Sequence, residues 1–424
     1  MKKLLLFLVI IFSVNISFLF SPKPEPEDES WCMEYVSLNQ YMGAPVNCDS
    51  YHFLNASIKP SLLFSSNYKR QSRPVYVIIG SFLGYSVYYL SQPFHDQLYR
   101  FLKERFATKY TPQQLRKATL YGSHYIGYLI FNVIISLVTA YLFEKCLKRL
   151  TGKSNIPTLQ LAAFVVFLNA HEISKAFFWT SHQQLLNILC PLLCLYVILA
   201  GRKLSSSTFR LSLAALSCGV LVLLYGSFWL LLPSIIFALY FDRERKQQPI
   251  QIILTVVTFF VPVVSWIFIL ELNNVKFYSH EVESYREFVW ILDALKVSGE
   301  AFMKQTLQNG YHYLLTFGYL LSYTGTLLVT FSITKMWSHT TSRDIISVKN
   351  QHKLLAVGFM FFTFYALLGF YEPRLTFSLA SLVLLFFASF SISSKTANAI
   401  TPIMWLCAAL LWHVYNVIAY GPFS

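Results

Sequence analysis

Long apolar segments of helical length recur along almost the whole chain and limit what it can fold into. These segments lie at about 4–20, 120–143, 157–170, 184–201, 211–241, 250–270, 312–333, 354–370, 375–392 and 399–420. A helix needs about 20 mostly apolar residues to cross the hydrocarbon core of a bilayer. Strands of outer-membrane barrels alternate apolar and polar residues instead. The pattern predicts an all-α fold, a polytopic transmembrane helix bundle, and excludes a porin.

The composition excludes two further classes of protein. Hydrophobic residues make up 55% of the chain and charged residues 13%, against about a quarter charged in a typical soluble protein. The net charge of +14 could indicate nucleic-acid binding, but the basic residues form short clusters between the apolar segments. We interpret these clusters as topology signals, and we expect a membrane environment and no nucleic-acid partner.

Two segments determine the number of crossings. Segment 211–241 is too long for one crossing, and Gly226 near its middle predicts a hairpin of two short helices. Segment 75–92 is apolar but diluted by Gly80 and Gly84. We expect 75–92 to lie at the interface or to re-enter, because a further crossing would export the short basic turns at 145–156, 202–210 and 242–249.

The predicted topology therefore has about 11 crossings (10–12), with the amino terminus cytoplasmic and the carboxyl terminus extracytoplasmic. The first region, 1–20, is expected to be an uncleaved transmembrane helix that acts as a signal anchor, with a cleavable signal peptide as the alternative. The other predicted regions are a first extracytoplasmic loop with short amphipathic, interfacial helices (21–119), a transmembrane core (120–270), an extracytoplasmic loop (271–311) and carboxyl-terminal transmembrane helices (312–424). The long loops all lie on one face, which predicts that the working surface is extracytoplasmic.

The first long loop opens with acidic residues beside an aromatic stretch. Asp28 and Glu29 precede a mixed aromatic and apolar segment that ends at Gly43. This pattern predicts a short amphipathic helix on the bilayer surface. The acids either solvate a linker, or one carboxylate serves as general base or metal ligand toward an incoming hydroxyl.

Several short motifs, taken in order, resemble the GT-C superfamily of polytopic glycosyltransferases, which use polyprenyl- or dolichyl-phosphate sugars. The motifs are Asp28-Glu29-Ser30-Trp31 through Tyr41-Met42-Gly43-Ala44-Pro45, then Lys59-Pro60, Phe178-Trp179-Thr180-Ser181-His182 and Tyr371-Glu372-Pro373-Arg374-Leu375. The resemblance extends over most of the chain. It implies transfer of a sugar from a lipid-phosphate carrier to a glycan, lipid or protein acceptor at the extracytoplasmic face.

The resemblance also implies roles for particular residues. A first-loop carboxylate, Asp28 or Glu29 with Glu34 as an equally placed competitor, takes the catalytic role. Arg374 meets the carrier phosphate, and Lys59 stands where an arginine is more usual. A divalent metal, Mg²⁺ or Mn²⁺, either takes part or does not; the residues leave both open.

Other candidate residues have both a structural and a functional interpretation. A guanidinium at the edge of an apolar helix suits phosphate, although Arg374 could instead snorkel or pair with Glu372. His171, Glu172 and His182 either have structural roles in the core or bind substrate. The aromatic and charged residues of loop 271–311 indicate a sugar-binding surface or an interfacial helix.

Two alternative functions remain open. A surface-polysaccharide polymerase or ligase would also be polytopic and use lipid-linked substrates, but would rely on arginine and histidine in a late loop. The second alternative is a non-enzymatic protein, a transporter or an assembly scaffold. Ion-coupled transporters usually carry acidic residues near the centres of their helices, and the apolar segments of this chain have none there, which disfavours transport but not a scaffold. The expected location is the bacterial inner membrane, or the endoplasmic reticulum if the host is eukaryotic.

Overall fold

The structure is a computed structural model that describes residues 2–24, 33–37, 39–106, 111–201, 207–241, 249–337, 350–393 and 400–419. These residues are almost entirely helical, with one pair of short strands, which confirms the predicted helical fold class. Seven of the described helices are long and apolar enough to cross a membrane, or up to eight with one bent pair. They indicate a multi-pass membrane protein, but the expected count of about 11 crossings is not confirmed.

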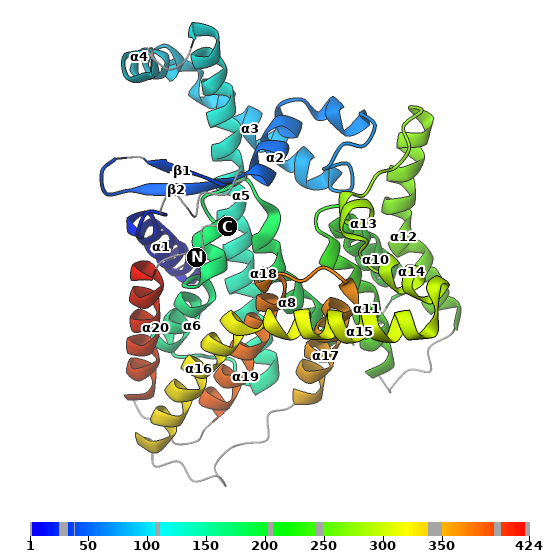
Figure 1. Cartoon of the computed structure of the whole chain (residues 1–424). Coiled ribbons are helices and arrows are strands. Elements are labelled where there is room, and N and C mark those ends of the chain that lie inside the picture. Colours follow the sequence, from blue (N-terminus) through cyan, green and yellow to red (C-terminus); the bar gives the residue numbers. More distant parts are fainter. Residues whose placement is uncertain are drawn as a thin grey trace.

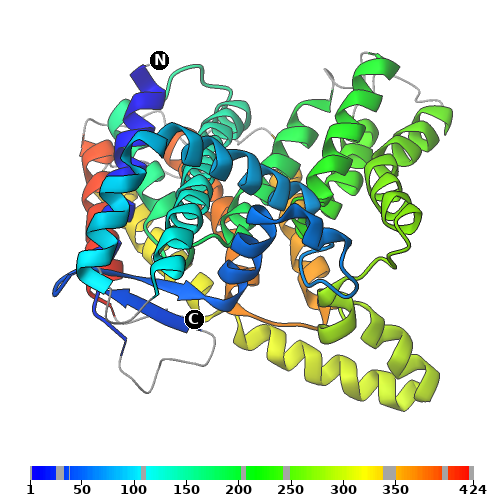
Figure 2. The ribbon, with the colours of Figure 1, turned by 90° about the horizontal axis from the view of Figure 1, so that it is seen from above.

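The bundle combines long and short apolar helices (Figures 1 and 2). Four of the seven candidate spans are single helices, α5 (Pro112–Thr151), α12 (Pro249–Leu272), α17 (Gln351–Leu368) and α20 (Ile400–Ile418). The other three are Lys2–Phe20, which contains α1 (Lys2–Ser17), Pro74–Glu104, which contains α3 (Pro74–Ser91), and Pro373–Ile392, which contains most of α19 (Ala380–Ser393). The bent pair is α15 (Gly299–Leu315) with α16 (Gly318–Trp337), at 46° to each other. The shorter apolar helices are α6 (Thr158–Asn169), α8 (Leu186–Leu199), α10 (Thr208–Val222) and α11 (Leu231–Phe241).

Helix α5 has clear start and stop signals in the sequence. Thr111 accepts the N–H of Gln114 (3.3 Å), and the Gln114 side chain accepts the N–H of Thr111 (2.8 Å), which forms a capping box. Pro112 occupies the first turn, and Gly152 ends the helix with a positive φ of 69°. This long helix packs against α3, α8 and α19, so several helices of the bundle are arranged around it.

Helices α3 and α5 approach each other through glycines. A Cβ on Gly127 of α5 would lie 2.6 Å from the backbone nitrogen of Gly84, and a Cβ on Gly80 would lie 2.1 Å from the Tyr128 ring. Gly80 and Gly84 have the four-residue spacing that allows close helix contact in membranes. The two glycines that dilute segment 75–92 therefore form a helix contact, and α3 is among the seven candidate spans.

The long apolar segment 211–241 is interrupted, as predicted. Helix α10 ends at Val222, Tyr225 is extended, and a 3₁₀ turn begins at Gly226 before α11 starts at Leu231. The interruption near Gly226 is confirmed. It brings the residues around Tyr225 to the cavity described below.

The expected amphipathic helix ending at Gly43 is wrong for the residues that the structure describes. They form an antiparallel hairpin of β1 (Met33–Ser37) and β2 (Gly43–Asn47). The Asn39 side chain accepts the N–H groups two and three positions later, at 2.8 and 2.9 Å, and this favours a turn. The Tyr35 ring packs over Gly43, 2.2 Å from where a Cβ would be, so a larger residue at this position would displace the ring.

Several short helices lie outside the long apolar ones. They are α2 (Cys48–Ile58), α7 (Glu172–Phe177), α13 (His280–Tyr285) and α14 (Val289–Val297). Helices α4 (His95–Phe106) and α18 (Pro373–Thr376) instead lie at the ends of the candidate spans Pro74–Glu104 and Pro373–Ile392. The hairpin and α2 lie together over one end of the bundle, above α1, α5 and α6 in the view of Figure 1. Residues 33–37 and 39–58 of the predicted first loop therefore form a folded cap.

Candidate functional site

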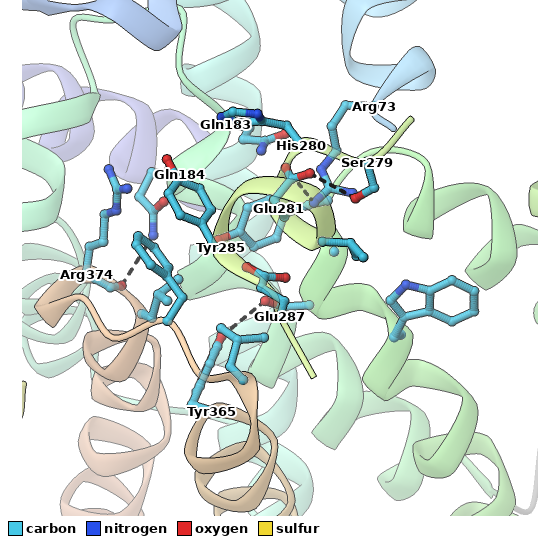
Figure 3. Close-up of a pocket in the computed structure, with 18 of the residues that line it drawn as sticks. Arg73, Gln183, Gln184, Ser279, His280, Glu281, Tyr285, Glu287, Tyr365 and Arg374 are labelled. Atoms are coloured by element: carbon cyan, nitrogen blue, oxygen red, sulfur yellow. Dashed lines mark hydrogen bonds and ion pairs between the residues drawn. The ribbon is translucent and has the colours of Figure 1, made fainter. Parts of the chain in front are cut away.

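A cavity of about 230 Å³ lies where six parts of the chain meet (Figure 3). They are the start of α2, the segment before α3, the turn after α7, the break between α10 and α11, the loop around α13, and the α17–α18 connection. Small-molecule pockets usually measure about 300–1,000 Å³. This cavity therefore suits a compact polar headgroup rather than a whole lipid.

A buried arginine and a carboxylate form an ion pair in one wall of the cavity. Arg70 is 4% exposed, and its Nη2 forms an ion pair with Oδ1 of Asp49, the second residue of α2. The guanidinium also lies over the Phe53 ring, 4.6 Å from its centre. Because a buried charge is costly without a partner, Asp49 and Arg70 hold each other in position.

His182 supplies a second hydrogen bond to the same carboxylate. Its Nε2 lies 3.2 Å from Oδ2 of Asp49, while its Nδ1 accepts the N–H of Gln184 at 3.1 Å. Nδ1 is therefore the acceptor and Nε2 carries the proton. Burial lowers the pKa of His182, and it outweighs the opposing effect of Asp49. His182 is thus a neutral donor at neutral pH.

The surroundings of Asp49 keep it ionised. Burial alone would raise the pKa of this carboxyl, but the hydrogen bond from His182 and the charges of Arg70 and Arg374 hold the pKa well below its usual range. Asp49 therefore carries a fixed negative charge at neutral pH. Such a weakly basic carboxylate is better suited to stabilising positive charge than to accepting a proton.

Arg374 provides a cation without a carboxylate partner. It lies in α18, and its guanidinium is 5.8 Å from the centre of the Phe177 ring. Among the described residues Arg374 forms no ion pair, so the expected alternative of pairing with Glu372 is not observed. The free guanidinium leaves the cavity able to attract an anion.

A buried polar network fixes the backbone that carries Arg374. Nδ2 of Asn187 donates to the Arg374 carbonyl at 3.0 Å, and Oδ1 of Asn187 accepts from the Tyr365 hydroxyl at 2.6 Å. The Ser227 hydroxyl lies 3.1 Å from that of Tyr365. Helices α8 and α17 and the 226–230 turn thereby position Arg374 together.

Two more carboxylates enter from the loop around α13. Glu281 accepts from Nη2 of Arg73 at 3.2 Å and from the Ser72 hydroxyl at 3.3 Å. Burial alone would raise the pKa of Glu281, but the charge of Arg73 and smaller effects of other partners outweigh it, so the pKa lies below its usual value. Glu287 behaves differently, because burial and then the charge of Glu281 raise its pKa to about 7, against a smaller opposing effect of Arg73.

The structure brings some of the predicted site residues together and separates others. His182 and Arg374 line the cavity. Lys59 is exposed beyond the end of α2. Asp28 and Glu29 lie outside the described residues, as does the side chain of Glu34, whose backbone pairs with Val46 in the hairpin.

His171 and Glu172 are buried elsewhere and do not line this cavity. Nε2 of His171 donates to the Leu168 carbonyl at 2.8 Å, and its Nδ1 accepts the N–H of Ser174 at 3.2 Å, so His171 caps α7. The pKa of Glu172 is raised because the effect of burial exceeds the opposing effects of a hydrogen bond from its own backbone N–H and of the charge of Lys175. These contacts support the structural interpretation of the pair.

Asp49, Arg70 and Arg73 are not among the site residues predicted from the sequence. The usable signal was the pair of arginines three apart just before Pro74, at the start of an apolar helix. In the described residues, no group of three or more histidine, cysteine, aspartate and glutamate side chains is placed to hold a metal ion.

Comparisons of this chain with known protein families, with curated proteins and with solved structures find no match.

Proposed function

We propose that this chain is a membrane glycosyltransferase of the GT-C type, which transfers a sugar from a polyprenyl- or dolichyl-phosphate carrier to an acceptor hydroxyl. The observation that carries the proposal is one cavity lined by both a first-loop carboxylate, Asp49, and a late guanidinium, Arg374, whose charge acts on that carboxylate. The motifs of the sequence implicate the same two regions of the chain. Asp49 is the first-loop carboxylate that lines the cavity, whereas Asp28, Glu29 and the side chain of Glu34 lie outside the described part of the chain.

The carrier phosphate is the group that Arg374 fits. A guanidinium presents a planar fork of donors that matches phosphate oxygens, and this one has no ion-pair partner among the described residues. The buried Arg70 lies near enough to affect the same titrating groups. As the carrier leaves, negative charge develops on its phosphate, and a prepositioned arginine stabilises that charge.

Asp49 fits the other half of the reaction. Glycosyl transfer passes through a transition state with positive, oxocarbenium-like charge on the sugar ring. A carboxylate held ionised by Arg70 and His182 is a fixed negative charge for that ring. Because the cavity accommodates only a compact group, the sugar and phosphate would enter it while the lipid chain stays in the bilayer.

The proposed orientation follows from the basic turns between the apolar segments. With those turns in the cytoplasm, the capped end with Asp49 opens on the extracytoplasmic face. We propose the bacterial inner membrane as its location. The acceptor is a glycan, a lipid or a protein.

The test uses the purified full chain in lipid nanodiscs. We would supply undecaprenyl-phosphate and dolichyl-phosphate hexoses with a radiolabelled sugar, together with membrane extract as acceptor, and measure transfer and release of the sugar. Arg374→Ala should weaken donor use roughly ten- to a hundredfold, because a hydrogen bond to a charged group contributes about 1.5–3 kcal/mol.

The matched control is Arg100→Ala, which removes an exposed arginine on α4 away from the cavity. It should leave transfer unchanged. Two results would refute the proposal: no sugar transferred or released from any of these donors by the wild type, or Arg374→Ala as active as Arg100→Ala.

A further inference from the structure

Glu287 is held in the cavity wall by an unusual backbone. The residues on either side, Arg286 and Phe288, have positive φ angles of 54° and 58°. Positive φ is uncommon for any residue other than glycine and is an outlier for a bulky side chain such as phenylalanine. Strained residues of this kind persist where the surrounding structure fixes them, and they concentrate at functional sites.

The contacts that fix this backbone come from the end of α17. The N–H of Phe288 donates to the Leu368 carbonyl at 3.0 Å, and Nε1 of Trp290 donates to the Leu367 carbonyl at 2.9 Å. Gly369 has a φ of 84°, and a Cβ there would lie 2.2 Å from the Trp290 ring. The Glu287 loop is therefore tied to the helix that also carries Tyr365.

Glu287 differs from the neighbouring glutamate of the same loop. Both line the cavity (Figure 3), but Glu281 is paired with Arg73, whereas no ion pair or side-chain hydrogen bond is formed by Glu287 among the described residues. The other charged and titratable groups that line the cavity are Asp49, Arg70, Arg73, His182, Tyr225, His280, Glu281, Tyr285, Tyr365 and Arg374. Glu287 is thus the unpaired carboxyl of the site.

The two unlike carboxyls suggest two different roles. The pKa of Asp49 lies well below its usual range, whereas burial and the Glu281 charge raise that of Glu287 to about 7. A general base works best with a pKa near the working pH. Carboxyls whose environments separate their pKa values in this way commonly divide the acid–base work of a site.

We propose that Glu287 accepts the proton of the acceptor hydroxyl during glycosyl transfer, an inference that rests on the proposed function. The acceptor oxygen forms a bond to the anomeric carbon as the bond from that carbon to the carrier phosphate oxygen breaks. The leaving phosphate keeps the electron pair beside Arg374. The hydroxyl proton passes to a carboxylate oxygen of Glu287, which later releases it to water.

The first experiment measures the rate of sugar transfer against pH for the nanodisc-reconstituted wild type, Glu287→Gln, Glu287→Asp and Glu283→Gln. Glu283 is exposed on α13 and does not line the cavity, which makes it the matched control. Wild type and Glu283→Gln should gain rate as the pH rises through about 7, where Glu287 becomes ionised. Glu287→Gln should lose about 10²–10⁴-fold in rate together with this pH limb, and Glu287→Asp should recover part of the rate.

The second experiment measures binding of sulfate, an anion whose charge does not change around neutral pH, by the fluorescence of Trp229 in the cavity wall. Ionised Glu287 repels an anion, so wild-type affinity should fall several-fold as the pH rises through about 7. Glu287→Gln should bind sulfate with an affinity independent of pH in this range. Glu283→Gln should behave as the wild type does.

The outcomes separate this inference from the proposed function. A wild type that transfers sugar, together with a Glu287→Gln variant that keeps the rate and the pH limb, overturns the role of Glu287 and leaves the glycosyltransferase proposal standing. A sulfate affinity that still falls with pH in Glu287→Gln also overturns it. A wild type that transfers no sugar from any of the donors refutes the proposed function, and the inference with it, whether or not it binds sulfate.

Discussion

The same glycine-to-alanine substitution should have opposite effects at two positions of α5. Gly122 and Gly127 both lie inside this helix, and a Cβ on Gly122 meets nothing within 4 Å. A Cβ on Gly127 would lie 2.6 Å from the nitrogen and 2.9 Å from the Cα of Gly84 in α3. Backbone atoms cannot rotate aside, so α3 and α5 would have to move apart.

The expected magnitudes follow from two effects. Alanine in place of glycine inside a helix contributes about 0.8–1 kcal/mol of stability at either position. Overpacking costs about 1–3 kcal/mol, and we expect the upper end because the contact is with backbone. Gly122→Ala should therefore stabilise by about 1 kcal/mol, and Gly127→Ala should destabilise by about 2 kcal/mol.

The measurement is the free energy of unfolding in mixed micelles, titrated with a denaturing detergent and followed by tryptophan fluorescence. Helix propensity cancels in the difference between the two variants, so the difference of about 3 kcal/mol reports the α3–α5 contact alone. Equal stability of Gly127→Ala and Gly122→Ala would refute the close approach of these helices. Because α3 follows directly after Arg73, a displaced α3 should also weaken sulfate binding in the cavity.

Three further predictions concern charge and backbone. Asp49→Asn removes the partner of buried Arg70; because Asp49 is 39% exposed, we expect a loss of about 1–2 kcal/mol in the free energy of unfolding, less than for a fully buried pair. Burial lowers the pKa of His171 from 6.5 to about 4, so as the pH falls the unfolded chain takes up a proton at this residue before the folded chain does. The free energy of unfolding should therefore decrease by up to about 3 kcal/mol between about pH 6.5 and about pH 4. His171→Gln should flatten this dependence of the free energy of unfolding on pH. Gly369→Ala places a side chain at a φ of 84° and against Trp290, and should lower the sugar-transfer rate in nanodiscs at unchanged protein yield.

Apolar patterning predicted the helical fold and its main interruption because both depend on local sequence. The start of α5 at Thr111 and its end at Gly152 follow from capping residues, and the break near Gly226 from a glycine in an overlong segment. Gly80 and Gly84 show the limit of this approach. Their spacing is visible in the sequence, but whether they dilute a helix or form a contact depends on the partner helix.

The hairpin of β1 and β2 shows a different limit. A short segment with mixed apolar and aromatic spacing is compatible with either a helix or a strand, and periodicity alone does not separate them. The turn at Asn39 and the contact between Gly43 and Tyr35 decide in favour of strands. Both features act only when the chain has already turned back on itself and the two strands are paired, so the spacing of apolar residues along the sequence does not reveal them.

The site itself could be predicted only in part because its charges come from distant parts of the chain. Asp49 is 133 residues from His182, and the Arg374 backbone is held by Asn187, 187 residues earlier. Each of these residues has an ordinary structural interpretation when considered alone. What distinguishes Asp49 from Asp28, Glu29 and Glu34 in the sequence is therefore not its own neighbours but a buried arginine 21 residues later, whose charge requires a carboxylate beside it.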